Sequence, residues 1–175
     1  NLTGKLSLTG EFSGDKIDAD EFRRSWQGQA QIQMKDTRTE GLNFQQLVQQ
    51  AVERSTNVQA QENYDNATRL DDVSTELQLN NGLVTLKGLQ GQSELMALTG
   101  QGELNLLKEE CDMRFNVRVL GGWKGESKLI DRLKQTAIPL RIYGNWQTLS
   151  YSLQVDQILR KQLQDEAKKR LNEWV

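Results

Sequence analysis

Residues 77–86 read Leu-Gln-Leu-Asn-Asn-Gly-Leu-Val-Thr-Leu, and this stretch decides the fold. Asn81 and Gly82 both tolerate a positive φ, so the pair predicts a two-residue type I′ hairpin turn. That turn sets the register of the flanking strands, in which Leu79 faces Val84. Apolar residues then meet apolar residues across the hairpin and polar residues fall on the other face, as a half-buried antiparallel pair requires.

Two more strands with strict alternation follow the hairpin. In residues 98–106 every second position is leucine or glycine, and in residues 113–119 every second position is a large apolar residue. This period of two predicts strands rather than helices. A pairing that sets Phe115 opposite Gly102 lets large side chains cover the glycines, which is one way to keep glycine in a sheet.

The rest of the chain predicts further strands and short helices around this meander. Strand-like alternation recurs in residues 1–12, 27–38, 138–142 and 149–155. Apolar residues fall at helical spacing in stretches that begin near Asp18, Asn43, Glu126 and Asp156. We therefore predict an α+β, mainly antiparallel fold. It is a curved open sheet of about eight strands (a half-barrel or β-groove) with three or four short amphipathic helices packed at its ends.

The chain has 175 residues, enough for one domain with a core. It begins with Asn1 rather than Met, and it ends at Val175 inside a helical pattern. We expect residues 1–175 to be a single domain excised from a longer protein. No apolar run approaches the roughly 20 residues that a membrane helix needs.

The composition argues against several classes of function. Acidic and basic residues are interspersed and the net charge is -2, so no basic stripe indicates nucleic-acid binding. The absence of histidine removes Ser-His-Asp triads, Cys-His pairs and most zinc sites. The single cysteine, Cys111, has acidic neighbours and is read as inert. We expect no catalytic residues, no cofactor, no metal site and no enzymatic activity.

Several segments, taken in order, resemble the C-terminal region of the AsmA-like family. They are residues 28–31, 41–43, 79–85, 98–104 and 138–146. The resemblance implies a protein anchored in the Gram-negative inner membrane by a helix outside this sequence and facing the periplasm. It further implies a β-groove architecture shared with bridge-like lipid transfer proteins. Family members are linked to outer-membrane biogenesis, lipopolysaccharide levels and phospholipid traffic, and the family offers no catalytic residues to carry over.

The leading functional hypothesis is lipid handling on the apolar face of the sheet. Acyl chains would slide along this face while their headgroups stay in water, since each buried methylene is worth about 0.8 kcal/mol and needs no specific partner. The candidate groove residues are Leu77, Leu79, Val84, Leu86, Leu98, Leu104, Leu106, Met113, Phe115, Val117, Val119, Leu140 and Ile142. The expected partners are lipid acyl chains and the rest of the anchored parent chain.

A second hypothesis makes the chain a docking module. Exposed strand edges or the C-terminal helix would then bind a periplasmic or outer-membrane protein by strand addition. The apolar stripes of the helices that include Phe44 and Leu163 also need a surface to cover. We expect these helices to close one end of the sheet and to leave an open apolar strip beyond them.

Overall fold

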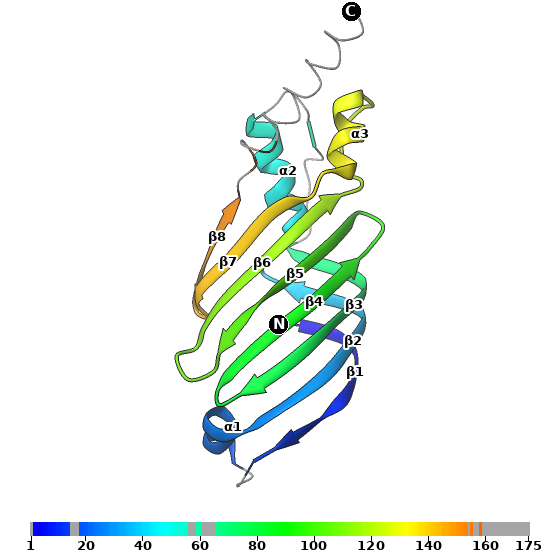
Figure 1. Cartoon of the computed structure of the whole chain (residues 1–175). Helices are drawn as coiled ribbons and strands as arrows, with labels where there is room; N and C mark the ends of the chain where they lie inside the picture. The colour runs from blue at the N-terminus through cyan, green and yellow to red at the C-terminus, as the bar shows by residue number, and fades with distance from the viewer. Residues whose placement is uncertain are drawn as a thin grey trace, which may run out of the picture.

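The computed structural model describes residues 2–14, 18–55, 59–60, 66–153, 155 and 158. Within this part of the chain, eight antiparallel strands form a single open sheet in the order β1-β2-β3-β4-β5-β6-β7-β8. The strands are β1 (Leu2–Ser13), β2 (Gln27–Glu40), β3 (Ala67–Asn80), β4 (Leu83–Gln92), β5 (Met96–Asn105), β6 (Glu110–Val119), β7 (Ile138–Asn145) and β8 (Thr148–Leu153). The predicted curved open sheet is confirmed, and Figure 1 shows that it twists strongly from β1 to β8.

The helices gather at two places on the sheet. They are α1 (Ala19–Ser25), α2 (Phe44–Ser55) and α3 (Lys128–Gln135). Figure 1 shows α2 and α3 together at one end of the molecule and α1 near the other. The helix expected to begin near Asp156 and to include Leu163 lies outside the described residues, apart from position 158.

The hairpin at residues 77–86 pairs as predicted. Leu79 lies opposite Val84, and the φ angles of Asn81 and Gly82 are 49° and 87°. These positive values are those of a type I′ turn. A methyl group on Gly82 would also collide with the carbonyl oxygen of Arg23 in α1, so the turn and the helix pack closely.

The predicted register of β5 and β6 is wrong by two residues. Gly102 lies opposite Met113 rather than Phe115, and Gly100 lies opposite Phe115. The glycines are nevertheless covered by large side chains. A Cβ atom on Gly102 would lie 2.5 Å from the Met113 sulfur, and one on Gly100 would lie 2.7 Å from the Phe115 ring.

The cause of this shift is the side chain of Asn105. Its Oδ1 accepts hydrogen bonds from the backbone N–H groups of Leu107 (3.1 Å) and Lys108 (3.0 Å). Such a local bond favours a turn over a continued strand. The turn therefore spans residues 106–109, β6 begins at Glu110, and Leu106 lies in the turn rather than in a strand.

The core lies where α2 and α3 cover the apolar face. Helix α2 begins next to Asn43, as expected, and Asn43 caps it, because its Oδ1 accepts from the backbone N–H of Gln46 at 3.0 Å. Ser127 caps α3 in the same way by accepting from the backbone N–H of Ile130. The buried cluster comprises Val48, Ala51, Val52, Met96, Leu98, Val117, Val119, Ile130, Leu133, Ile138, Leu140, Ile142 and Val155.

A buried glutamine ties α2 to the segment after β6. The Gln49 side chain is fully buried, and its Nε2 donates to the carbonyl oxygen of Gly121 at 3.0 Å. We expect Gln49→Leu to lower the free energy of unfolding by about 1–3 kcal/mol, because the carbonyl oxygen of Gly121 loses its hydrogen bond from the Gln49 side chain. Urea unfolding measures the change, with the exposed Gln50→Leu as control. Equal stability of the two variants would contradict this role.

Candidate functional site

Two unbroken rows of apolar residues and glycines cross the sheet from edge to edge. Each row follows directly paired residues from β1 to β8. The Gly10 row is Gly10, Ala30, Leu77, Leu86, Gly102, Met113, Ile142 and Tyr151. The Phe12 row is Phe12, Gly28, Leu79, Val84, Leu104, Cys111, Gly144 and Leu149. Apart from the Tyr151 hydroxyl and the Cys111 thiol, these rows bring no polar side-chain group to this face.

A third row shows how the helices cover part of the face. The Leu6 row continues through Met34, Val73, Gly91, Leu98, Val117 and Ile138. Its last three members are buried in the core beneath α2 and α3. At its other end, in contrast, the side chain of Leu6 is 61% exposed. The same row therefore passes from a closed core to an open edge.

Both edge strands of the sheet present uncovered apolar side chains on this face. On β1 these are Leu2, Leu6 and Leu8, and on β8 they are Leu149 and Tyr151. Tyr151, at the end of the Gly10 row, is 52% exposed. Isolated exposed leucines are ordinary, but a set that continues an apolar floor on one face indicates a binding surface.

The predicted groove residues fall into different environments. Leu98, Val117, Val119, Leu140 and Ile142 form part of the core, and Phe115 packs against it. Leu79, Val84 and Met113 are buried outside that cluster, whereas Leu77, Leu86 and Leu104 are half-buried. Leu106 lies in the β5–β6 turn and is half-buried.

The exposed residues of the edge strands were not among the predicted site residues. Leu8 pairs with Ile32 and Leu6 with Met34, so both continue the apolar face onto β1. The sequence does place these residues on the apolar face, because they occupy alternate positions in their strands.

The lone cysteine lies on the apolar face. Cys111 sits in the Phe12 row between Leu104 and Gly144. Partial burial raises the pKa of its thiol above the ordinary value, and the nearby Asp112 carboxylate adds to this. The thiol therefore stays protonated at neutral pH, which agrees with the reading of Cys111 as an inert residue.

The opposite face is polar and carries two shallow hollows. They measure about 720 and 690 Å³ and share Gln90, Thr99 and Asn116 in their linings. Beside them, Arg141 donates two hydrogen bonds of 2.9 Å to the Asp112 carboxylate, which lowers the pKa of Asp112. These side chains are solvated, so leaving them open to water costs little. Exposed apolar side chains do carry such a cost, and they lie at the β1 and β8 ends of the apolar face. We take this face, with its exposed ends, as the site.

The described part of the chain forms neither a metal-ion site nor a membrane-spanning helix. Among those residues, no three or more Cys, Asp or Glu side chains come together to hold a metal ion. No helix among them has the length and apolar character needed to cross a bilayer.

Comparison with known proteins gives one strong match. Protein AsmA of Escherichia coli (strain K12) is 65% identical over 175 residues, which is 99% of this chain. The chain spans 28% of the length of that protein. No family model matches the chain. No solved structure matches it either.

Proposed function

Because this chain is a member of the AsmA family, with 65% identity over 99% of its length, we propose that its apolar sheet face handles lipid in outer-membrane biogenesis. The cargo is a phospholipid or a lipopolysaccharide-related lipid moving between the inner and outer membranes. The chain acts on the periplasmic side of the Gram-negative inner membrane, attached to the remainder of its parent protein.

One observation carries this proposal. The Gly10 and Phe12 rows run unbroken across the sheet, and the exposed apolar side chains of β1 and β8 extend the same face beyond the helices. An acyl chain laid along this face gains about 0.8 kcal/mol for each methylene removed from water. No directional contact is needed, so the lipid remains free to slide. Helices α2 and α3 close one end and leave the β1 end open (Figure 1).

The test is site-specific photo-crosslinking in cells. A crosslinking amino acid at Leu8 or Leu86 faces the apolar rows, and one at Ser7 or Thr85 faces the opposite side of the same strands. We expect lipid adducts at the first pair of positions and none at the second. Lipid adducts from both faces, or from neither, would refute the proposal. Val117 is a poor reporter because its side chain is fully buried.

A second candidate function, docking of an envelope protein by strand addition, is favoured by the free edge of β1. All 12 residues of this strand except Phe12 are exposed, and among the described strands only β2 pairs with it. Such an edge is a template for another strand. Protein adducts from both Ser7 and Leu8, without lipid adducts, would favour docking over lipid handling.

A further inference from the structure

A second group of exposed apolar side chains lies away from the sheet face, on the connections at one end of the strands. In an antiparallel meander, alternate connections fall at the same end. Here that end carries α1 and the turns at residues 81–82, 106–109 and 146–147, which we call the turn rim. Figure 1 shows α1 and these turns along one side of the molecule.

Contacts between the connections hold the turn rim together. The backbone N–H of Asn81 donates to the carbonyl oxygen of Trp26 at 3.1 Å. The backbone N–H of Leu106 donates to the carbonyl oxygen of Gly82 at 2.8 Å. The backbone N–H of Trp146 donates to the carbonyl oxygen of Glu109 at 3.0 Å. These bonds join each connection to its neighbour, so the rim is ordered before any partner arrives.

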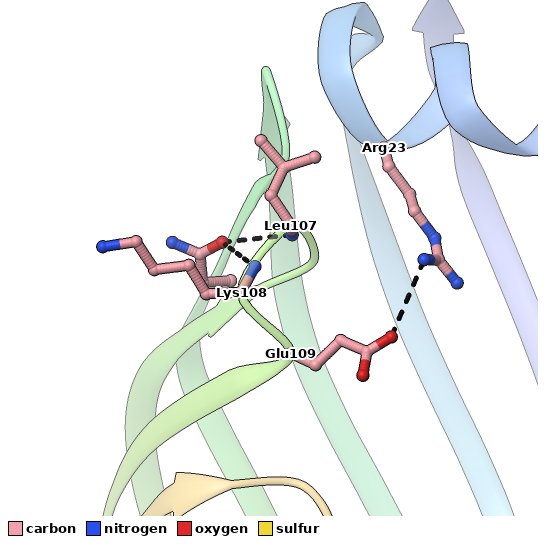
Figure 2. Close-up of polar contacts among 5 residues, drawn as sticks. Arg23, Leu107, Lys108 and Glu109 are labelled. Atoms are coloured by element: carbon pink, nitrogen blue, oxygen red, sulfur yellow. Dashed lines mark hydrogen bonds and ion pairs between the residues drawn. The ribbon is translucent and has the colours of Figure 1, made fainter.

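An ion pair links α1 to the turn at residues 106–109. The Arg23 guanidinium lies 3.8 Å from the Glu109 carboxylate, as Figure 2 shows. Both side chains are nearly half exposed, so the pair adds little stability. It does balance the charge of Glu109 at the centre of the rim.

The turn rim exposes three large apolar side chains. Leu107 is 53% exposed, Phe22 is 42% exposed and Trp146 is 39% exposed. The hydrogen bonds from Leu107 and Lys108 to the Asn105 side chain fix the shape of the turn that presents Leu107 (Figure 2). At the opposite end of the strands, the described connections expose one such residue, Leu95, at 42%. Of the two ends of the strands, the turn rim therefore carries more of the exposed large apolar side chains.

The three exposed side chains of the turn rim, which we call its apolar tips, are of the types found at the surface of a bilayer. Tryptophan, phenylalanine and leucine beside Arg24 and Lys108 form the composition of segments that lie in a membrane interface. Taken together, α1 and the three turns carry three acidic and three basic residues, so the rim has no net charge. Insertion of the apolar tips, rather than attraction to anionic headgroups, therefore drives the contact. The apolar tips are separate from one another. A stable protein–protein interface needs a continuous complementary surface, whereas separate side chains can each insert into a fluid bilayer.

We propose that the turn rim is a docking surface for a phospholipid bilayer, with Phe22, Leu107 and Trp146 inserted among the headgroups. The inference goes beyond the proposed function. Bilayer contact at the rim and acyl-chain binding on the sheet face use different residues. Either one can fail while the other holds.

The experiment is co-sedimentation of the chain with vesicles of equimolar phosphatidylethanolamine and phosphatidylglycerol. We expect Leu107→Ser to weaken binding about tenfold and Phe22→Ser with Leu107→Ser to weaken it about a hundredfold. The matched control is Leu95→Ser, which removes an apolar residue as exposed as Phe22 from the other end of the strands and is expected to leave binding unchanged. All of these sites are on the surface, and equal Tm values for the variants check that folding is intact.

A spectroscopic readout assigns the contact to the rim. Vesicles with brominated acyl chains are expected to quench tryptophan fluorescence, and Trp146→Phe is expected to remove most of the quenching while binding persists. Absence of vesicle binding, or equal loss in Leu95→Ser and Leu107→Ser, would overturn the proposal. So would a photo-crosslinker at Leu107 that yields only protein adducts in cells, which would assign the rim to a protein partner.

Discussion

Val48→Asp is expected to remove at least about 3–5 kcal/mol of stability, most of what a domain of this size has. Val48 has no exposed surface and lies in the cluster that joins α2 to the sheet. A carboxylate there has no cation to pair with among the described core residues, so its desolvation is not compensated. Denaturant unfolding followed by circular dichroism measures the loss.

The control for this change is Gln50→Asp, two residues further along α2. Gln50 is exposed, so the same carboxylate remains in water and stability is expected to change by less than about 0.5 kcal/mol. A Val48→Asp variant as stable as Gln50→Asp would mean that α2 does not pack on the sheet. The apolar face would then be open over the core end as well.

The double variant Leu6→Asp and Leu8→Asp is expected to weaken binding of a fatty-acyl probe about a hundredfold. The physical reason is that two leucines of the open face stop contributing apolar contact and place charge beside the chain. Both side chains are exposed in the free protein, so stability is expected to change little. Fluorescence titration with a labelled fatty acid gives the affinity.

The matched control places the same two charges on the other side of the same strand, as Ser7→Asp and Thr9→Asp. These residues pair with Gln33 and Gln31 on the polar face. Binding is expected to stay within about twofold of the unmodified chain, the size of a screened long-range charge effect. Equal weakening in both double variants would show that charge, rather than the apolar face of β1, controls binding.

Local rules predicted the β3–β4 hairpin and the start of α2 correctly, because each depends on a few adjacent residues. The Asn81-Gly82 turn sets the register of β3 and β4, and α2 begins at Phe44, directly after the Asn43 near which the helix was expected to begin. The register of β5 and β6 failed because two turn positions were available and the Asn105 side chain selects the earlier one. The alternation remained correct, since a shift of two residues keeps every side chain on its face.

The alternation of apolar and polar residues did not predict which apolar side chains are exposed. Leu8 and Leu98 stand in similar alternating strands, yet Leu8 is on the open edge and Leu98 is in the core. The difference arises from helix α2, which is distant from both residues in sequence and covers only one of them. A pattern tells which face a residue occupies, but coverage depends on tertiary packing. For this reason the open part of the site was assigned to the meander instead of to β1.

The strand order also has a kinetic consequence. Because every strand pairs with its neighbour in sequence, a chain emerging from its N-terminus can add each strand to an edge that already exists. The entropy cost of closing each loop stays small, except where α2 separates β2 from β3 and where α3 separates β6 from β7. At every stage of synthesis the nascent sheet has one growing edge, and the next segment of its own chain is the first to reach it.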